Sequence, residues 1–172
     1  RKDYKEIAIT GCINHKIKNL ATSQFFLKEG PLAILPFAKN RFSFVWSLSK
    51  LLYEKNINNI DHFVKDKIKN ILKINYDIQV FNLQPYPIHL NLERKYHDRN
   101  ILILGEGLHS IHPVAGQGFN LVLRDIKKLK EILEYYSTLG ISINNSYALK
   151  DFYVQRKPEN IIFGLGIDMT HK

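Results

Sequence analysis

Apolar and polar residues alternate along the first part of the chain and predict an antiparallel sheet. The alternation runs through three segments, residues 5–13, 21–37 and 41–48. A period of two is typical of strands that bury one face, and the Glu-Gly-Pro cluster at 29–31 predicts a turn inside the second segment. In the third segment the pattern places Phe42, Phe44 and Trp46 on one side. The sheet is therefore expected to carry an aromatic face.

Helical spacing takes over further along the chain. Helices are predicted over residues 59–72, 117–136 and 144–163. Strand alternation returns after the first of them, in residues 77–83 and 86–92. The second helix should have an apolar face made of Leu123, Ile126, Leu129 and Leu133, because these residues recur at three-to-four spacing. Pro158 should kink or split the third helix.

A glycine-containing loop connects a short apolar run to the second helix. Residues 101–104 are all apolar, which is typical of a strand buried on both faces in a parallel sheet. The loop begins at Gly105, and Gly116 and Gly118 flank the start of the helix. Free N–H groups and the positive end of the helix dipole favour phosphate or carbonyl oxygens at such a position. The alternative is that the glycines only close the turn.

Composition and charge narrow the functional classes. The net charge is +9, but the 19 lysines and 6 arginines are dispersed, so no nucleic-acid partner is expected. A loose positive field is better suited to an anionic membrane surface. The single cysteine, Cys12, cannot form an internal disulfide, which favours a reducing compartment. His109 and His112 lack a third ligand nearby, so no metal is expected.

The loop and the following helix carry a long motif. The sequence HPVAGQGFNLVLRD, residues 112–125, resembles the second flavin-binding motif of FAD-dependent aromatic hydroxylases, the flavoprotein monooxygenases similar to para-hydroxybenzoate hydroxylase. It looks most like the ubiquinone-biosynthesis branch. The matching residues are His109, His112, Pro113, Ala115, Gly116, Gln117, Gly118, Asn120, Leu121, Arg124 and Asp125. Segments 30–37, 42–49, 86–94 and 153–161 also match, so the resemblance covers most of the chain.

The resemblance implies a set of cofactor-binding residues. They are Gly105, Glu106, Pro113, Ala115, Gly116, Gln117, Gly118, Phe119 and Asn120. Amides from Gly116 to Asn120 would face the pyrimidine edge of the flavin, Pro113 would pack near the ring, and Glu106 would accept hydrogen bonds from the ribityl hydroxyls. Arg124 and Asp125 are expected to anchor the helix to the surrounding fold. Nothing in the chain stands out as a catalytic acid or base.

The resemblance also implies a mixed α/β (α+β) fold with two parts. Residues 1–93 are expected to form the antiparallel sheet of a substrate domain, with Phe42, Phe44 and Trp46 contacting substrate or, alternatively, filling the core. Residues 94–172 are expected to form the C-terminal part of a Rossmann-like FAD-binding domain. The implied substrate is a polyprenyl phenol in ubiquinone biosynthesis, which is hydroxylated with FAD as cofactor and NAD(P)H as electron donor.

Two departures from the family pattern qualify this expectation. The family's Asp-Ala-Ala is replaced by Glu106, Gly107 and Leu108, and the chain has no G-x-G-x-x-G fingerprint for the ADP half of FAD. The expectation is therefore a C-terminal half that binds FAD weakly and is inactive alone, with a separate N-terminal half as partner.

Other functions and associations stay open. One alternative is a non-catalytic remnant or binding subunit of a split flavoprotein, and another is an unrelated basic α+β binding module. The expected location is the cytoplasm, with peripheral association at the inner membrane surface or with a biosynthetic complex as a further expectation.

Overall fold

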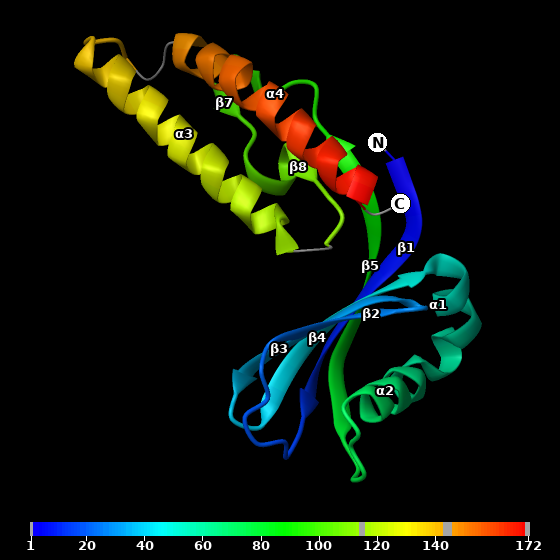
Figure 1. The fold of residues 1–172 in the computed structure, drawn as a ribbon. Coiled ribbons are helices and arrows are strands. Elements are labelled where there is room, and N and C mark those ends of the chain that lie inside the picture. The colour runs from blue at the N-terminus through cyan, green and yellow to red at the C-terminus, as the bar shows by residue number, and fades with distance from the viewer. Residues whose placement is uncertain (1, 114–115, 143–145, 171–172) are drawn as a thin grey trace. The chain divides into compact units, whose positions relative to one another are not determined.

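A computed structural model describes residues 2–113, 116–142 and 146–170 (Figure 1). The chain divides into two compact units. We call residues 5–88 the sheet unit, and residues 1–4 together with 89–172 the helical unit. The sequence placed a boundary after residue 93, whereas the contacts divide the chain after Ile88.

The sheet unit is built on strands that run in the order β2-β3-β4-β1-β5. Their bounds are β1 (Lys2–Asn14), β2 (Ser23–Leu27), β3 (Gly30–Ala38), β4 (Arg41–Ser49) and β5 (Gln79–Leu92). The β2–β3, β3–β4 and β1–β4 pairs are antiparallel. The alternation in the sequence and the turn before Gly30 are thus confirmed. Helix α1 (Lys50–Asn56), the 3₁₀ turn η1 (Ile57–Asn59) and helix α2 (Ile60–Ile71) connect β4 to β5.

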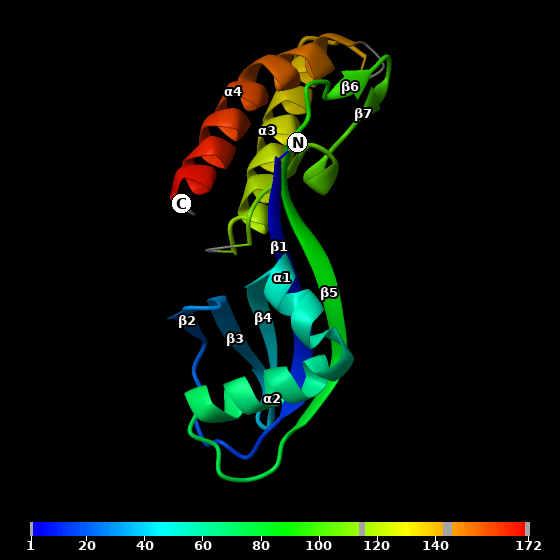
Figure 2. The same ribbon diagram turned by 90° about the vertical axis from the view of Figure 1, so that its right-hand side faces the viewer.

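The aromatic face of the sheet is the core of this unit. Phe42, Phe44 and Trp46 are fully buried, and the Trp46 ring stacks on Phe63 of α2 with ring centroids 5.4 Å apart. Figure 2 shows α2 crossing this face of the sheet. The indole N–H of Trp46 donates to the Gly30 carbonyl at 3.2 Å. The three aromatic residues therefore fill the core, and none of them exposes surface with which to contact a substrate.

The opposite face of the same sheet carries small side chains. The register pairs Thr10 with Val45, Cys12 with Ser43, and Ala33 with Val45. Residues that alternate with the buried aromatics must point to the other side of the sheet. Most of these small side chains are partly accessible. The accessible surface at the centre of the sheet is thus made of short side chains.

The helical unit consists of two long helices and several short elements. They are β6 (His97–Asp98), β7 (Ile101–Leu102), the 3₁₀ turn η2 (Gly105–Gly107), β8 (His109–Ser110), α3 (Gly118–Thr138) and α4 (Ser146–Thr170). Strand β8 pairs antiparallel with the last residues of β5. A second core is formed by Tyr96, Leu108, Ile132, Ala148 and Phe152. Together the two units confirm the mixed α/β class with an antiparallel sheet.

The apolar run 101–104 is not a buried parallel strand in this chain. Only Ile101 and Leu102 form a strand, and β7 pairs antiparallel with β6. Ile101 is 71% exposed, and Ile103 and Leu104 are also exposed. The prediction failed because four apolar residues are buried on both sides only when neighbouring layers cover them. In the described part of the chain only Leu102 packs against a core, and the other three side chains are uncovered.

The long helices also differ from the prediction. Helix α3 buries Leu121, Asp125 and Ile132. Of the predicted apolar face, Leu129 and Leu133 pack against the second core, whereas Leu123 and Ile126 are each 49% exposed. The reason is that the Asp125 carboxylate is paired inside the unit, so the helix turns that side inward. Helix α4 runs on past Pro158 without being split. No helix in the described ranges has both the length and the hydropathy that a membrane span requires.

Gly30 is a position where this sheet tolerates no side chain. Its φ is +129°, and a Cβ atom would lie 2.0 Å from the Ser47 carbonyl oxygen. We expect Gly30→Ala to lower the free energy of unfolding of the sheet unit by roughly 3 kcal/mol or more, because backbone strain and a steric clash add together. Denaturant unfolding followed by the fluorescence of Trp46, the only tryptophan, measures it.

Gly166→Ala serves as the control for this substitution. No atom lies within 4 Å of the Cβ position at Gly166, which is inside α4. This variant should leave the Trp46 transition unchanged. An unchanged midpoint for Gly30→Ala would contradict the account.

Candidate functional site

The loop between β8 and α3 exposes Pro113 and Gly116. Gly116 has a φ of +60°, which side-chain-bearing residues rarely adopt, and its N–H donates to the Pro113 carbonyl at 3.0 Å. No described atom lies within 4 Å of the position that a Cβ would take. Pro113 and Gly116 are both exposed, so a planar group could approach this segment closely.

The start of α3 adds free donors to the loop. Gln117, at the N-cap position, makes no side-chain capping bond, and its Oε1 instead accepts from Asn120 Nδ2 at 3.2 Å. Gly118, Phe119 and Asn120 form the first helical turn, where amide groups lack partners within the helix. These amides and the helix dipole favour an electron-rich group at this end.

The turn η2 lies against the same helix. Gly105 has a φ of +67°, and its Cβ position is 3.9 Å from both γ-methyl groups of Val122. Glu106 follows it and is exposed. The fold thus brings the Gly105–Glu106 turn to the first turns of α3, as a shared ligand would require. Ala115, the remaining predicted residue, lies outside the described residues.

The replacement of alanine by Leu108 does not crowd the loop. The Leu108 side chain is fully buried in the second core, with Ile132 and Phe152. Its added bulk is therefore accommodated inside the unit rather than at the exposed backbone of the loop.

A buried polar cluster lies behind the loop. Asp125 is fully buried, and its Oδ2 is 2.6 Å from His109 Nε2. Its Oδ1 accepts from Arg156 Nε at 2.7 Å and from Asn160 Nδ2 at 3.2 Å. Arg156 also donates to Asn160 Oδ1 at 2.8 Å, and Asn160 Nδ2 lies 3.3 Å from the Tyr96 hydroxyl. We call His109, Asp125, Arg156 and Asn160 the Asp125 cluster.

Electrostatics keep the Asp125 carboxyl ionised. Burial on its own would raise its pKa, but hydrogen bonds from His109, Arg156 and Asn160 outweigh burial and lower it. An ionised carboxylate only accepts hydrogen bonds, so His109 must carry its proton on Nε2. Burial is also the main cause that raises the pKa of the Tyr96 hydroxyl.

Sequence reasoning found part of this arrangement. The anchoring role expected of Asp125 is confirmed, and the Arg124 guanidinium lies over the Phe163 ring of α4 at 4.9 Å, which also joins the helices. Sequence reasoning did not predict that Arg156 and Asn160 bind the Asp125 carboxylate. Their spacing of four residues, which places two polar side chains on one helix face, was the available signal.

The two histidines of the motif have separate surroundings. His109 faces Asp125, whereas the His112 ring meets the Tyr4 ring edge-on at 5.2 Å. Across the described ranges, no group of three or more His, Cys, Asp or Glu side chains is placed to hold a metal ion.

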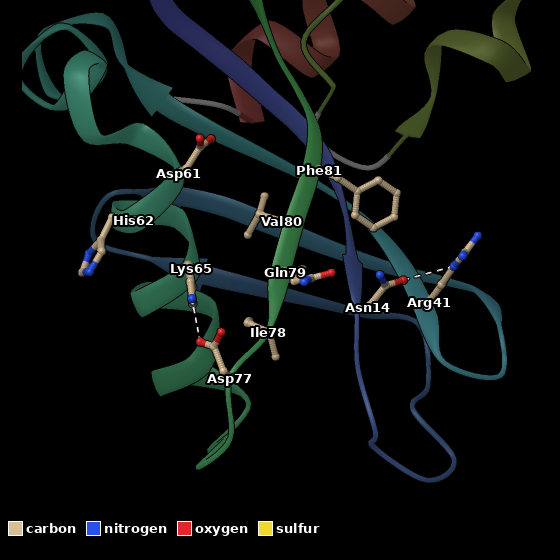
Figure 3. A pocket seen from close by; sticks show the side chains of 10 residues that line it. All are labelled: Asn14, Arg41, Asp61, His62, Lys65, Asp77, Ile78, Gln79, Val80 and Phe81. Atoms are coloured by element: carbon tan, nitrogen blue, oxygen red, sulfur yellow. Dashed lines mark hydrogen bonds and ion pairs between the residues drawn. The ribbon is translucent and has the colours of Figure 1, made fainter.

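A cavity of about 650 Å³ lies in the sheet unit, and none of the predicted cofactor-binding residues lines it (Figure 3). Four of its charged and polar side chains are paired with each other: Lys65 pairs with Asp77 at 2.6 Å, and Arg41 donates to Asn14 at 3.1 Å. Figure 3 shows these two pairs on opposite sides of β5, so they do not converge on a common ligand. We assign no function to this cavity.

The glycine loop and the uncapped start of α3 form a candidate site for an electron-rich group. The FAD binding domain family matches residues 12–138, which is most of the chain. The chain belongs to this family.

Curated relatives share the match over most of the chain. The mitochondrial ubiquinone biosynthesis monooxygenase COQ6 of Dictyostelium discoideum is 28% identical and covers 84% of this chain. The ubiquinone hydroxylase UbiL of Rhodospirillum rubrum is 29% identical over 92% of it, and the 3-demethoxyubiquinol 3-hydroxylase of Escherichia coli is 27% identical over 88%. The match takes in only 36%, 38% and 39% of these proteins, respectively.

Solved structures share the fold at low identity. The p-nitrophenol 4-monooxygenase PnpA of Pseudomonas putida superimposes on 98% of this chain and 43% of its own, with a TM-score of 0.76 and 14% identity. Aklavinone-11 hydroxylase, solved with FAD and aklavinone, gives a TM-score of 0.78 at 12% identity, over 97% of this chain and 32% of its own.

Protonation of Asp125 at acid pH should lower the stability of the helical unit. Because the pKa of Asp125 is lowered in the folded chain, its contribution to stability is complete above about pH 4 and is lost as the pH falls through the folded pKa. We expect Asp125→Asn to be destabilised by roughly 3–5 kcal/mol at neutral pH. It should also lose less stability than the parent between neutral and acid pH.

Denaturant unfolding at a series of pH values, followed by helical circular dichroism, measures both effects. Glu131→Gln, which removes an exposed carboxylate from the same helix, is the control and should follow the parent curve closely. If the free energy of unfolding of the parent and of Asp125→Asn changed in parallel with pH, the Asp125 charge would not be stabilising.

Proposed function

We propose that this chain supplies the flavin-ring side of an FAD-dependent monooxygenase that hydroxylates a polyprenyl phenol in ubiquinone biosynthesis. The observation that carries the proposal is the exposure of Pro113, Gly116, Phe119 and Asn120, together with an uncapped helix start and open space over Gly116. The names of the curated relatives support the pathway, and membership of the FAD binding domain family supports the cofactor.

The residues present fit one end of FAD. The amides from Gly116 to Asn120 would stabilise negative charge on the flavin ring, and Pro113 would pack against it. Glu106 would accept hydrogen bonds from the ribityl chain. Bound FAD, reduced by NAD(P)H, would supply the oxygen-transfer chemistry.

The substrate ring is proposed to lie on the small-residue face of the sheet. The aromatic face is closed by α2, whereas Thr10, Cys12, Ser43 and Val45 leave room for a flat apolar group. Because a polyprenyl phenol partitions into lipid, the proposal includes action at the inner surface of a cytoplasmic membrane, alone or in a biosynthetic complex.

The ADP half of FAD is proposed to be held by a second α/β segment. The printed sequence has no G-x-G-x-x-G, and the helical unit exposes apolar side chains that such a segment would cover. They are Ile101, Ile103, Leu104, Phe119, Leu123 and Ile126, which we call the uncovered patch. We expect the chain to be inactive without that segment, supplied as a separate N-terminal half.

A non-catalytic binding subunit is the second candidate. It is favoured by Glu106, which places its carboxylate one methylene farther out than the family's aspartate and could weaken FAD binding by about 0.5–1.5 kcal/mol. Flavin content of the assembled protein distinguishes the two candidates.

The test is to co-express the chain with a polypeptide that carries the dinucleotide fingerprint and to measure the flavin absorbance of the purified assembly. We expect stoichiometric FAD in the assembly and no tight binding by the chain alone. Gly116→Val should remove most of the FAD, because a branched side chain would occupy the open space over the loop.

Gly140→Val is the matched control. Gly140 has a φ of +68° and equally open surroundings, so the substitution introduces the same backbone strain away from the loop. It should leave the flavin content unchanged. Full FAD occupancy in the Gly116→Val assembly would refute the assignment of the loop, and a flavin-free parent assembly would favour the binding subunit.

The uncovered patch gives an independent test of the second segment. We expect Leu123→Asp to abolish co-purification with the fingerprint-bearing polypeptide, because a charge would be buried without a partner. Lys127→Asp, on the same helix, changes charge at an exposed residue outside the patch and should leave the complex intact. Equal recovery of both variants in pull-down would argue against docking at this patch.

A further inference from the structure

We propose that the Asp125 cluster is a positioning device for the loop that would face the flavin: it fixes both ends of the loop and the rotation of α3, and so controls cofactor affinity without touching the cofactor. The predicted effect on cofactor affinity rests on the proposed function. The predicted effect on the position of the loop concerns this chain alone.

The first argument is the placement of the cluster along the chain. His109 lies in β8, immediately before the loop, and Asp125 lies in the second turn of α3, after it. The 2.6 Å contact between His109 Nε2 and Asp125 Oδ2 therefore joins the two ends of the loop. Arg156 and Asn160 hold the same carboxylate from α4.

The second argument concerns the described residues of the loop. Gly116 meets no described atom at its Cβ position, and the N-cap residue Gln117 makes no side-chain capping bond. The His112 ring, in contrast, meets the Tyr4 ring edge-on at 5.2 Å. Strong described contacts thus lie before the loop's glycine, at His112 and at the His109–Asp125 pair.

The third argument comes from the rotation of α3. Hydrophobic periodicity favours a helix that turns Leu123 and Ile126 inward, yet each is 49% exposed, and the fully buried Asp125 lies inward beside Leu121 and Ile132. The paired carboxylate and these two apolar side chains therefore fix the same rotation of α3. That rotation sets where the amides of the first turn lie.

The chemistry of the cluster allows no simple replacement. Asp125 accepts on both oxygens, from His109 on one and from Arg156 and Asn160 on the other. Asparagine offers one acceptor and one donor, so with its oxygen toward Arg156 its NH₂ would face His109 Nε2. His109 would then have to move its proton to Nδ1, which is buried and has no hydrogen-bond partner among the described residues. The charge on Asp125 thus fixes the His109 tautomer that carries its proton on Nε2.

The experiment measures amide hydrogen exchange in fragments that cover residues 110–120. Asp125→Asn is compared with Glu131→Gln, and His109→Leu is compared with His109→Gln. Asp125→Asn and His109→Leu should accelerate exchange there by roughly tenfold to a hundredfold, the range expected for losing a hydrogen bond to a buried charge. His109→Gln, which keeps a donor toward Asp125, should restore most of the protection. Glu131→Gln should match the parent.

A second measurement distinguishes an effect on the position of the loop from a general loss of stability. In the co-expressed assembly, the dissociation constant for FAD should rise about tenfold for His109→Leu and stay near the parent value for His109→Gln. Exchange in fragments from residues 23–49 should be unchanged in every variant, because they belong to the other unit.

The outcomes are distinguishable. Unchanged loop exchange in His109→Leu, or equal effects of His109→Leu and His109→Gln, would overturn the proposal, as would acceleration in His109→Leu that is spread evenly over α3 and α4. If Asp125→Asn does not fold, the two His109 variants decide alone. If the parent assembly holds no FAD, the proposed function fails while the exchange data still decide whether the cluster positions the loop.

Discussion

One buried carboxylate organises the helical unit. Asp125 has no contact with water, and it is held by donors from β8 and α4. Removing a charge from water is costly unless the charge is fully paired, so the elements that supply the donors must stay where they are. The placement of η2, β8 and both long helices follows from that requirement.

The same requirement explains which surfaces the unit leaves open. Because α3 turns Asp125 inward, Leu123 and Ile126 point away from the core. They lie one to two turns beyond Phe119, at helical spacing, so the three form a continuous stripe. The exposed backbone of the loop begins at the same end of the helix. The surface proposed for a further protein segment and the surface proposed for a cofactor thus arise from one rotation of one helix.

The sequence predicted the parts of this structure that depend on local periodicity. The strands, the turn before Gly30 and the helix over residues 60–71 were expected because alternation and helical spacing report directly on which face is buried. The glycine loop was expected on the strength of its motif.

What the sequence did not predict depends on partners far apart in the chain. A periodicity count treats Asp125 as a surface residue, because nothing within a few positions shows that Arg156 and Asn160 will pair with it. Residues 101–104 were assigned to a buried strand because four apolar residues carry no information on whether another layer covers them. The aromatic residues of β4 could have served the core or a ligand, and only the position of α2 decides for the core.

The uncovered patch also ties the behaviour of the chain to mass action. Apolar side chains such as Ile101 and Phe119 are attracted to any complementary apolar surface, including the same patch on another copy. A segment that covered the patch and a second copy would therefore compete for one surface. Covering the patch would keep this chain from associating with itself.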